Sequence, residues 1–179
     1  MALFVIGDTH LSLSVDKPMD IFGGWKNYMQ RLEQNWRSVV GEQDTVVIPG
    51  DVSWGMSLEQ AKADFAFLHA LPGKKILMKG NHDYWWTTKS KMDRFLEECG
   101  FDTLTILHNN AISAEGVSLC GSRGWMFEQG QEHDKKLIAR EAASAPPCRT
   151  RRGLATRRRF CFCTTRPSLC RTASPSFLR

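Results

Sequence analysis

Three short apolar runs lie in the first half of the chain, and a polar cluster follows each of them directly. The runs cover residues 2–6, 45–48 and 75–78, and Gly, Pro or polar residues bound them as they bound strand cores. Apolar residues recur at steps of three and four over 25–40 and 58–71, which predicts amphipathic helices that cover a sheet. This alternation of strand and helix predicts an α/β fold.

Start and stop signals place the helices more closely. Ser57, with Gln60 three residues later, matches a capping box at the start of the second helix. A third helix is expected from about Lys89 to Glu98, ended by Gly100. Further along, the pattern becomes β-rich and then helical again; the expected elements are strands at 103–107, 111–114 and 117–120, turns at Asn109-Asn110 and Glu115-Gly116, and a helix over about 132–143.

Composition divides the chain near residue 141. Residues 1–140 carry 15 Lys and Arg against 18 Asp and Glu, whereas residues 141–179 carry 9 Arg, no Lys and one acid. Four of the six Cys and four of the seven Pro also lie in the second segment. We therefore expect one domain over 1–140 and an Arg-, Cys- and Pro-rich tail over 141–179 that is aberrant or disordered.

Two interpretations of this tail stay open. In the first, the tail is a shifted reading frame, because codons that began one nucleotide earlier over residues 160–167 could encode an apolar run ending in Leu-His-Tyr-Pro-Pro. In the second, it is a disordered Arg-rich segment in its true frame.

The sequence also predicts the compartment. The N-terminus lacks the basic region of a signal peptide, and no apolar stretch approaches the roughly 20 residues of a membrane span. We therefore expect a cytoplasmic protein with no membrane partner. Cys99 and Cys120, the cysteines of residues 1–140, are expected to be reduced and structural.

The polar clusters after the first two runs contain residue types that bind cations. In Asp8-Thr9-His10, residues two apart in an extended segment point alike, so that Asp8 and His10 can grip one ion. Asp51, after Pro49-Gly50, has two oxygens that can bridge two ions. Each motif has a structural alternative when it is taken alone, namely a turn aspartate or an Asx-turn or helix-cap carboxylate.

The third cluster, Gly80-Asn81-His82-Asp83, is the most specific. Asn81 offers an amide oxygen, and His82 beside Asp83 offers an oriented imidazole. Gly80 allows the backbone to approach closely. Since all three clusters follow strands, we expect their side chains to converge at one edge of the sheet.

Together these motifs resemble the signature of the calcineurin-like metallophosphoesterase superfamily, which is DxH, then GD, then GNHD. The order Gly-Asp-x-Ser-Trp, a helix and Gly-Asn-His-Asp-Tyr-Trp looks like the small bacterial predicted phosphohydrolases of this superfamily. The resemblance covers about residues 2–140. It implies a four-layer α-β-β-α sandwich, with the second sheet incomplete here because part of it comes from the region that no longer matches.

The resemblance also implies the roles of six residues toward two divalent metal ions, Mn, Fe or Zn. Asp8 and His10 would bind the first ion, Asp51 would bridge both, and Asn81 would bind the second. A metal-activated hydroxide would attack phosphorus, and His82, held by Asp83, would protonate the leaving oxygen.

This chain departs from the family pattern in two ways. A strand-end His and a terminal Gly-His-x-His motif are missing, so that activity is expected to be impaired. Val52-Ser53-Trp54 replaces the second Asp and the Arg of protein Ser/Thr phosphatases, which favours a small-molecule phosphoester over a phosphoprotein.

Three classes of function therefore remain. The first is a metal-dependent phosphoesterase, for which nucleic acid would be a partner only as a substrate. The second is an inactive metal-binding remnant. The third is a nucleic-acid-binding protein that acts through its basic tail. Among the other notable residues, Tyr84-Trp85-Trp86 could wall a cleft or pack on the core, and His69 is expected at the C-terminus of a helix.

Overall fold

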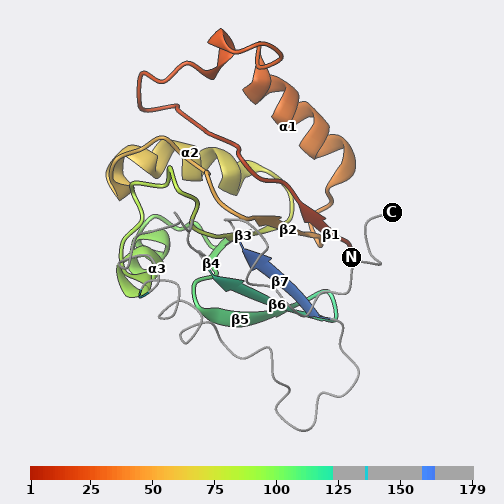
Figure 1. The fold of residues 1–179 in the computed structure, drawn as a ribbon. Helices are drawn as coiled ribbons and strands as arrows, with labels where there is room; N and C mark the ends of the chain where they lie inside the picture. Colours follow the sequence, from red (N-terminus) through yellow and green to blue (C-terminus); the bar gives the residue numbers. More distant parts are fainter. Residues whose placement is uncertain (123–135, 137–158, 164–179) are drawn as a thin grey trace, which may run out of the picture.

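The computed structural model describes residues 1–122, 136 and 159–163. Its first sheet has four parallel strands in the order β1-β2-β3-β4 (Figure 1). The strands are β1 (Leu3–Val5), β2 (Thr45–Ile48), β3 (Lys74–Leu77) and β4 (Leu104–Ile106). Because neighbours in the sheet are also neighbours in sequence, the loops after β1, β2 and β3 leave the same edge side by side.

Three helices cover one face of this sheet (Figure 1). They are α1 (Tyr28–Val39), α2 (Leu58–Ala70) and α3 (Lys89–Glu98), and a short 3-10 helix η1 (Met19–Ile21) precedes α1. Ser57 caps α2 as predicted, since its side chain accepts a hydrogen bond from the Gln60 N–H at 3.3 Å. The Gln60 side chain accepts from the Met56 N–H at 2.9 Å, one residue earlier than a standard capping box requires.

A second sheet contains β5 (Asn110–Ala114), β6 (Val117–Ser122) and β7 (Arg159–Cys163). β5 and β6 form an antiparallel hairpin whose turn residues Glu115 and Gly116 have φ of 47° and 75°, as a two-residue hairpin turn requires. β7 runs parallel to β6 and comes from the segment that composition sets apart.

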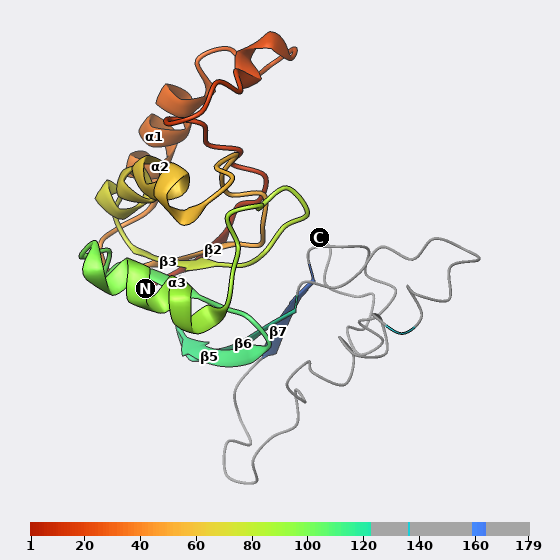
Figure 2. The same cartoon turned by 90° about the vertical axis from the view of Figure 1, so that its left-hand side faces the viewer.

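The second sheet packs on the face of the first sheet that the helices leave uncovered (Figure 2). Side chains along β2 alternate, so that Val46 and Ile48 face the helices and Val47 faces the second sheet. Leu119 of β6 joins this second core beside Ile76. The α/β sandwich is therefore confirmed with three of its four expected layers.

The predictions made from the sequence beyond residue 122 fall mostly on residues that the structure does not describe. Of the helix expected over 132–143, only Lys136 is described, and it is helical. The domain boundary at 140/141 lies outside the described residues. The outer helix layer and the incompleteness of the second sheet also stay predictions.

The two sheets approach closely where β6 carries Gly121. A Cβ at Gly121 would lie 2.8 Å from the Leu107 side chain and 2.9 Å from Met78 Cε. A larger residue here would force the Leu107 and Met78 side chains to move.

Lys75, on β3, is a buried cation at the amino end of the first sheet. Its ammonium donates hydrogen bonds to carbonyls just beyond α2, those of Leu71 and Gly73, the latter at 2.7 Å. Burial lowers the pKa of Lys75 to about 8. His69 lies in the last turn of α2, as predicted, with its Nδ1 3.0 Å from Thr103 Oγ1.

Within the described part of the chain, no helix has both the length and the hydropathy to cross a bilayer.

Candidate metal centre

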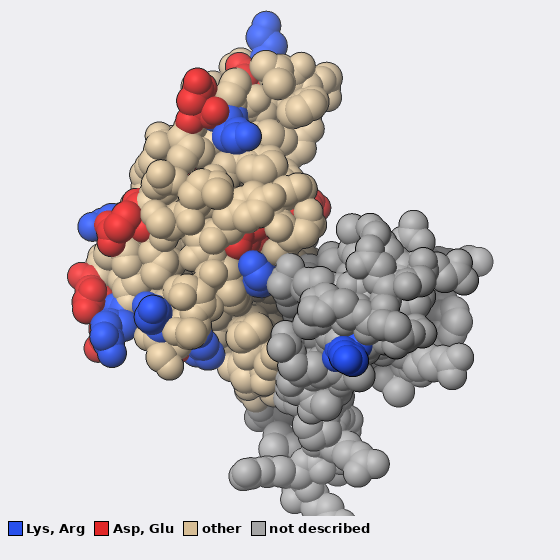
Figure 3. Space-filling model, turned by 60° about the vertical axis from the view of Figure 1, so that its left-hand side comes forward, with Lys and Arg blue, Asp and Glu red and all other residues tan. Residues whose placement is uncertain are grey.

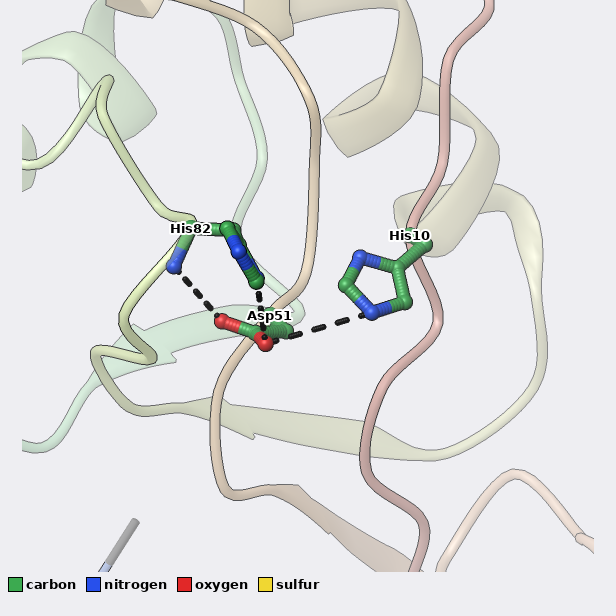
Figure 4. A group of neighbouring side chains, drawn as sticks. All are labelled: His10, Asp51 and His82. Atoms are coloured by element: carbon green, nitrogen blue, oxygen red, sulfur yellow. Dashed lines mark hydrogen bonds and ion pairs between the residues drawn. The ribbon is translucent and has the colours of Figure 1, made fainter. Parts of the chain in front are cut away.

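The loops that follow β1, β2 and β3 bring His10, Asp51 and His82 together at the carboxyl edge of the first sheet (Figure 4). One potential ligand atom from each residue lies within 4.8 Å of those of the other two. The sequence motifs predicted this convergence, because parallel strands end at the same edge.

Asp51 lies between the two histidines. Its Oδ2 is 3.1 Å from His82 Nδ1 and 3.9 Å from His10 Nε2. Its Oδ1 accepts a hydrogen bond from the His82 backbone N–H at 2.9 Å. A single carboxylate thus faces both imidazoles, as a group that bridges two cations would have to do.

His10 is held mainly by its neighbours' rings. It stacks on Trp54, with ring centroids 4.9 Å apart and an interplanar angle of 18°. Tyr28 donates its hydroxyl proton to the His10 carbonyl at 2.8 Å. The Nδ1 atom of His10 is buried and has no hydrogen-bond partner among the described residues.

The backbone at the site is held in an unusual conformation. Asp8, His10 and Asp51 have φ of 55°, 44° and 51°, a left-handed region that side chains other than Gly adopt at a cost of about 1 kcal/mol or more. Hydrogen bonds between the first two loops maintain it: the His10 N–H donates to the Asp51 carbonyl at 2.9 Å and the Asp8 N–H to the Gly50 carbonyl at 3.2 Å. Such strain concentrates at functional sites.

Two glycines make the close packing of the loops feasible. A Cβ at Gly80 would lie 2.1 Å from Asp51 Oδ1 and 2.2 Å from the Asp51 backbone nitrogen. A Cβ at Gly50 would lie 2.6 Å from the Gly80 backbone. The prediction that Gly80 permits a close backbone approach is therefore confirmed.

Asp83 has a different role from the one expected for it. Its side chain is fully buried, and its carboxylate accepts five hydrogen bonds, from the N–H groups of Asp51, Val52, Ser53 and Gly80 and from the Trp85 indole. Burial raises the pKa of Asp83, and the hydrogen bonds from the Gly80, Val52 and Ser53 N–H groups and from the Trp85 indole act in the opposite direction. The expectation that Asp83 holds the His82 ring is wrong in this structure, because its oxygens bind the loop that carries Asp51, and Asp51 contacts His82.

Asp8 and Asn81 lie at the periphery of the site. The Asp8 side chain is 73% exposed, with Oδ1 4.0 Å from His10 Nε2. The expectation that this motif is extended is wrong, since both Asp8 and His10 have left-handed φ. Asn81 is exposed, and its Nδ2 lies 3.1 Å from His82 Nδ1.

Sequence reasoning missed two residues that support the site. Trp54 is part of the Gly-Asp-x-Ser-Trp motif and of the departure from phosphatases, but neither pattern predicts that its ring contacts both histidines. Asp64, on α2, is fully buried and accepts hydrogen bonds from Ser53 Oγ at 2.5 Å and the Leu13 N–H at 2.8 Å. Burial raises the pKa of Asp64. An acid between Ala61 and Phe65 on the apolar face of α2 was the available signal.

The residues of the Tyr84-Trp85-Trp86 cluster lie partly in the core and partly at the surface. Trp85 is 2% exposed and belongs to the core, which confirms the packing alternative for this residue. Tyr84 is 54% exposed.

The donor set fits a divalent transition metal. The imidazole of His10 and the carboxylate of Asp51 offer nitrogen and oxygen ligands, which suit Mn²⁺, Fe and Zn²⁺. The Nδ1 atom of His10 is buried beside these ligands without a hydrogen-bond partner among the described residues. Such an atom is available to a further ligand.

Two known proteins are similar to this chain. The chain is 46% identical over 52 residues to the Gene 66 protein of Mycobacterium phage L5, a match that covers 29% of this chain and 25% of the phage protein. It also aligns with a solved structure of a protein of unknown function from Aquifex aeolicus, at 18% identity and a TM-score of 0.48, over 92% of this chain and 90% of the other.

The sequence model of calcineurin-like phosphoesterases matches residues 1–139, which is most of the chain. The protein therefore belongs to the calcineurin-like phosphoesterase family, a family of metal-dependent phosphoester hydrolases.

Proposed function

We propose that this chain hydrolyses a small-molecule phosphate ester with two divalent ions, Mn²⁺ being the first candidate. The observation that carries the proposal is the position of the Asp51 carboxylate between His10 and His82, at 3.9 and 3.1 Å. Asp8 and His10 would hold one ion, Asn81 the other, and Asp51 both. Bound ions would supply positive charge to the phosphate oxygens and acidify a coordinated water.

The protein's own groups contribute orientation and proton transfer. Asp51 would accept the Nδ1 proton of a protonated His82, and Nε2, which lies 3.3 Å from the Asn81 amide nitrogen, would donate its proton to the leaving oxygen. The His82 side chain is 40% exposed and is therefore open to substrate. Asp83 keeps the loop that carries Asp51 in place by accepting hydrogen bonds from its backbone N–H groups.

The test is hydrolysis of p-nitrophenyl phosphate and bis(p-nitrophenyl) phosphate with and without added Mn²⁺, together with calorimetric titration of Mn²⁺. Asp51→Asn should lower kcat/KM by at least about 100-fold, because it removes the shared charge. Asp93→Asn is the matched control, since Asp93 pairs with Lys89 on the surface of α3. Mn²⁺-independent hydrolysis, or an unchanged Asp51→Asn variant, would refute the proposal.

The inactive remnant is the second candidate, and one observation favours it. Among the described His, Cys, Asp and Glu residues, the compact group at this edge has three members, and the Asp8 side chain is 73% exposed and outside it. A metal site with few ligands holds its ion weakly and positions it poorly. The remnant predicts Mn²⁺ binding that Asp51→Asn weakens, with no turnover of either ester.

The nucleic-acid-binding alternative rests on the tail, of which the structure describes only residues 159–163. On the face of the described body shown in Figure 3, acidic and basic side chains are interspersed. Such a distribution does not favour nucleic-acid binding by that face.

A further inference from the structure

Trp54 is the aromatic side chain that contacts both histidines of the site. Its ring centroid lies 4.9 Å from that of His10 and 4.9 Å from that of His82. The Trp54 backbone is fixed, because its N–H donates to the Leu11 carbonyl at 2.9 Å. The position of the ring is therefore a built feature of the loop after β2.

Trp54 is also within reach of solvent. Whereas Trp85 is 2% exposed, Trp54 is half-buried. The ammonium of Lys17, an exposed residue, lies 5.6 Å from the Trp54 ring centroid. The charged side chain of an exposed residue thus already rests against this ring.

The neighbouring segments expose an unusual amount of apolar surface. The side chains of Leu13, Ile21, Phe22 and Met56 are 50%, 74%, 54% and 63% exposed. All four belong to the segment between β1 and α1 or follow Trp54 closely in sequence. A second indole, Trp25, lies 6.1 Å from His10. Exposed apolar side chains on the segments that carry site residues are available to a ligand.

On the basis of the proposed function, we propose that Trp54 is a stacking subsite for an aromatic group on the phosphate ester. A phosphate bound at His10, Asp51 and His82 would place its substituent next to the Trp54 ring, since the indole borders both imidazoles. A flat substituent gains offset or edge contacts there that an alkyl group cannot make. The substrate class is thus an aryl or nucleobase-bearing phosphoester, and Lys17 adds positive charge beside the ring.

Binding of two phosphonates to the Mn²⁺-loaded protein, measured by calorimetry, tests this without any turnover. Phenylphosphonate should bind about tenfold more tightly than methylphosphonate, as expected for one stacking contact. Measured with Mn²⁺ kept saturating, so that any effect of Trp54 on His10 acts on both ligands alike, Trp54→Leu should reduce the ratio to about twofold or less. Trp54→Phe should retain most of the preference.

Val39→Ala is the control, because Val39 is an exposed apolar residue at the end of α1 and belongs to none of these segments. It should leave the ratio unchanged. Equal binding of both phosphonates by the wild type would overturn the subsite while leaving the phosphoesterase proposal intact. So would an equal loss of both affinities in Trp54→Leu, because Trp54 would then only position His10. Binding of Mn²⁺ but of neither phosphonate would overturn the phosphoesterase proposal, and the subsite with it.

Discussion

Strand β3 has a fully buried charge near each end, and the two charges serve different purposes. Lys75, near its start, donates to carbonyls that follow α2. Asp83, beyond its end, accepts from N–H groups of the loops that carry Asp51 and His82. Both satisfy the rule that a buried charge needs several hydrogen-bond partners.

The difference lies in which backbone each charge holds. The partners of Lys75 close the end of a helix and include no site residue. The partners of Asp83 lie on loops where Asp51 is held at a φ of 51°. A change at Asp83 should therefore affect the metal site and stability together, whereas a change at Lys75 should affect stability alone.

Gly80→Ala should cause the largest loss at the site end. The added Cβ would overlap Asp51 Oδ1 and the Asp51 nitrogen, at 2.1 and 2.2 Å, so the Asp51 loop must move. We expect the Mn²⁺ affinity to fall by about 100-fold or more. Calorimetric titration measures it, and Gly23→Ala is the control, because a Cβ there meets nothing within 4 Å. Wild-type affinity in Gly80→Ala would show that the loop packing is unimportant.

Asp83→Asn should rank second. The amide keeps the shape of the side chain but turns NH₂ toward N–H donors, which should lower the free energy of unfolding by about 3 kcal/mol. The Mn²⁺ affinity should also fall, by about 10- to 100-fold. Urea unfolding and calorimetry measure the two effects. A loss of stability without a loss of affinity would break the proposed link between Asp83 and the site.

Lys75, near the start of β3, should make the free energy of unfolding depend on pH. Its pKa is about 8 in the folded chain against 10.5 ordinarily, so between these values the unfolded chain holds a proton that the folded chain has released. The free energy of unfolding should therefore rise with pH from about 8 to 10.5, by at most about 3 kcal/mol.

The measurement is urea unfolding at pH 7.5 and 9.5 of the wild type and of Lys75→Met. The difference between the two proteins isolates Lys75 from other groups that titrate in this range. An identical pH dependence in both would mean that Lys75 keeps an ordinary pKa. Mn²⁺ affinity at pH 7.5 should be the same in both proteins.

Ser57→Ala should have the smallest effect. It removes the N-cap of α2, whose far end lies close to Lys75, and should lower the free energy of unfolding by about 1 kcal/mol with no change in Mn²⁺ affinity. Thermal or urea unfolding measures the loss. A drop in metal affinity would show that α2 itself is coupled to the site.

Most of the described fold was predictable because its signals are local. Hydrophobic periodicity located the strands and helices, and α3 has the predicted bounds, Lys89–Glu98. α1 begins at Tyr28 and not at residue 25, because Asn27 takes a left-handed φ of 52° that ends any helix extension. No local pattern signals such a residue.

The convergence of three of the expected site residues was predictable, and their contacts were less so. His10, Asp51 and His82 meet as expected, because parallel strands bring their following loops to one edge. Asp83 was assigned the wrong partner, since adjacency to His82 in sequence does not show which way a buried carboxylate points. The Asp8 and His10 motif predicts an extended segment, but hydrogen bonds between the loops hold both residues in the left-handed conformation.

The sequence by itself therefore determined the order of elements, the family and the residues at the carboxyl edge, because these depend on periodicity and on short motifs. Only the tertiary structure decided that Asp51 lies between the two imidazoles, that Trp54 borders both, and that Asp83 supports the loop from within. These features depend on burial and on contacts between residues far apart in the sequence, such as Asp51 and His82, which are 31 positions apart, and such contacts form only when the sheet has assembled.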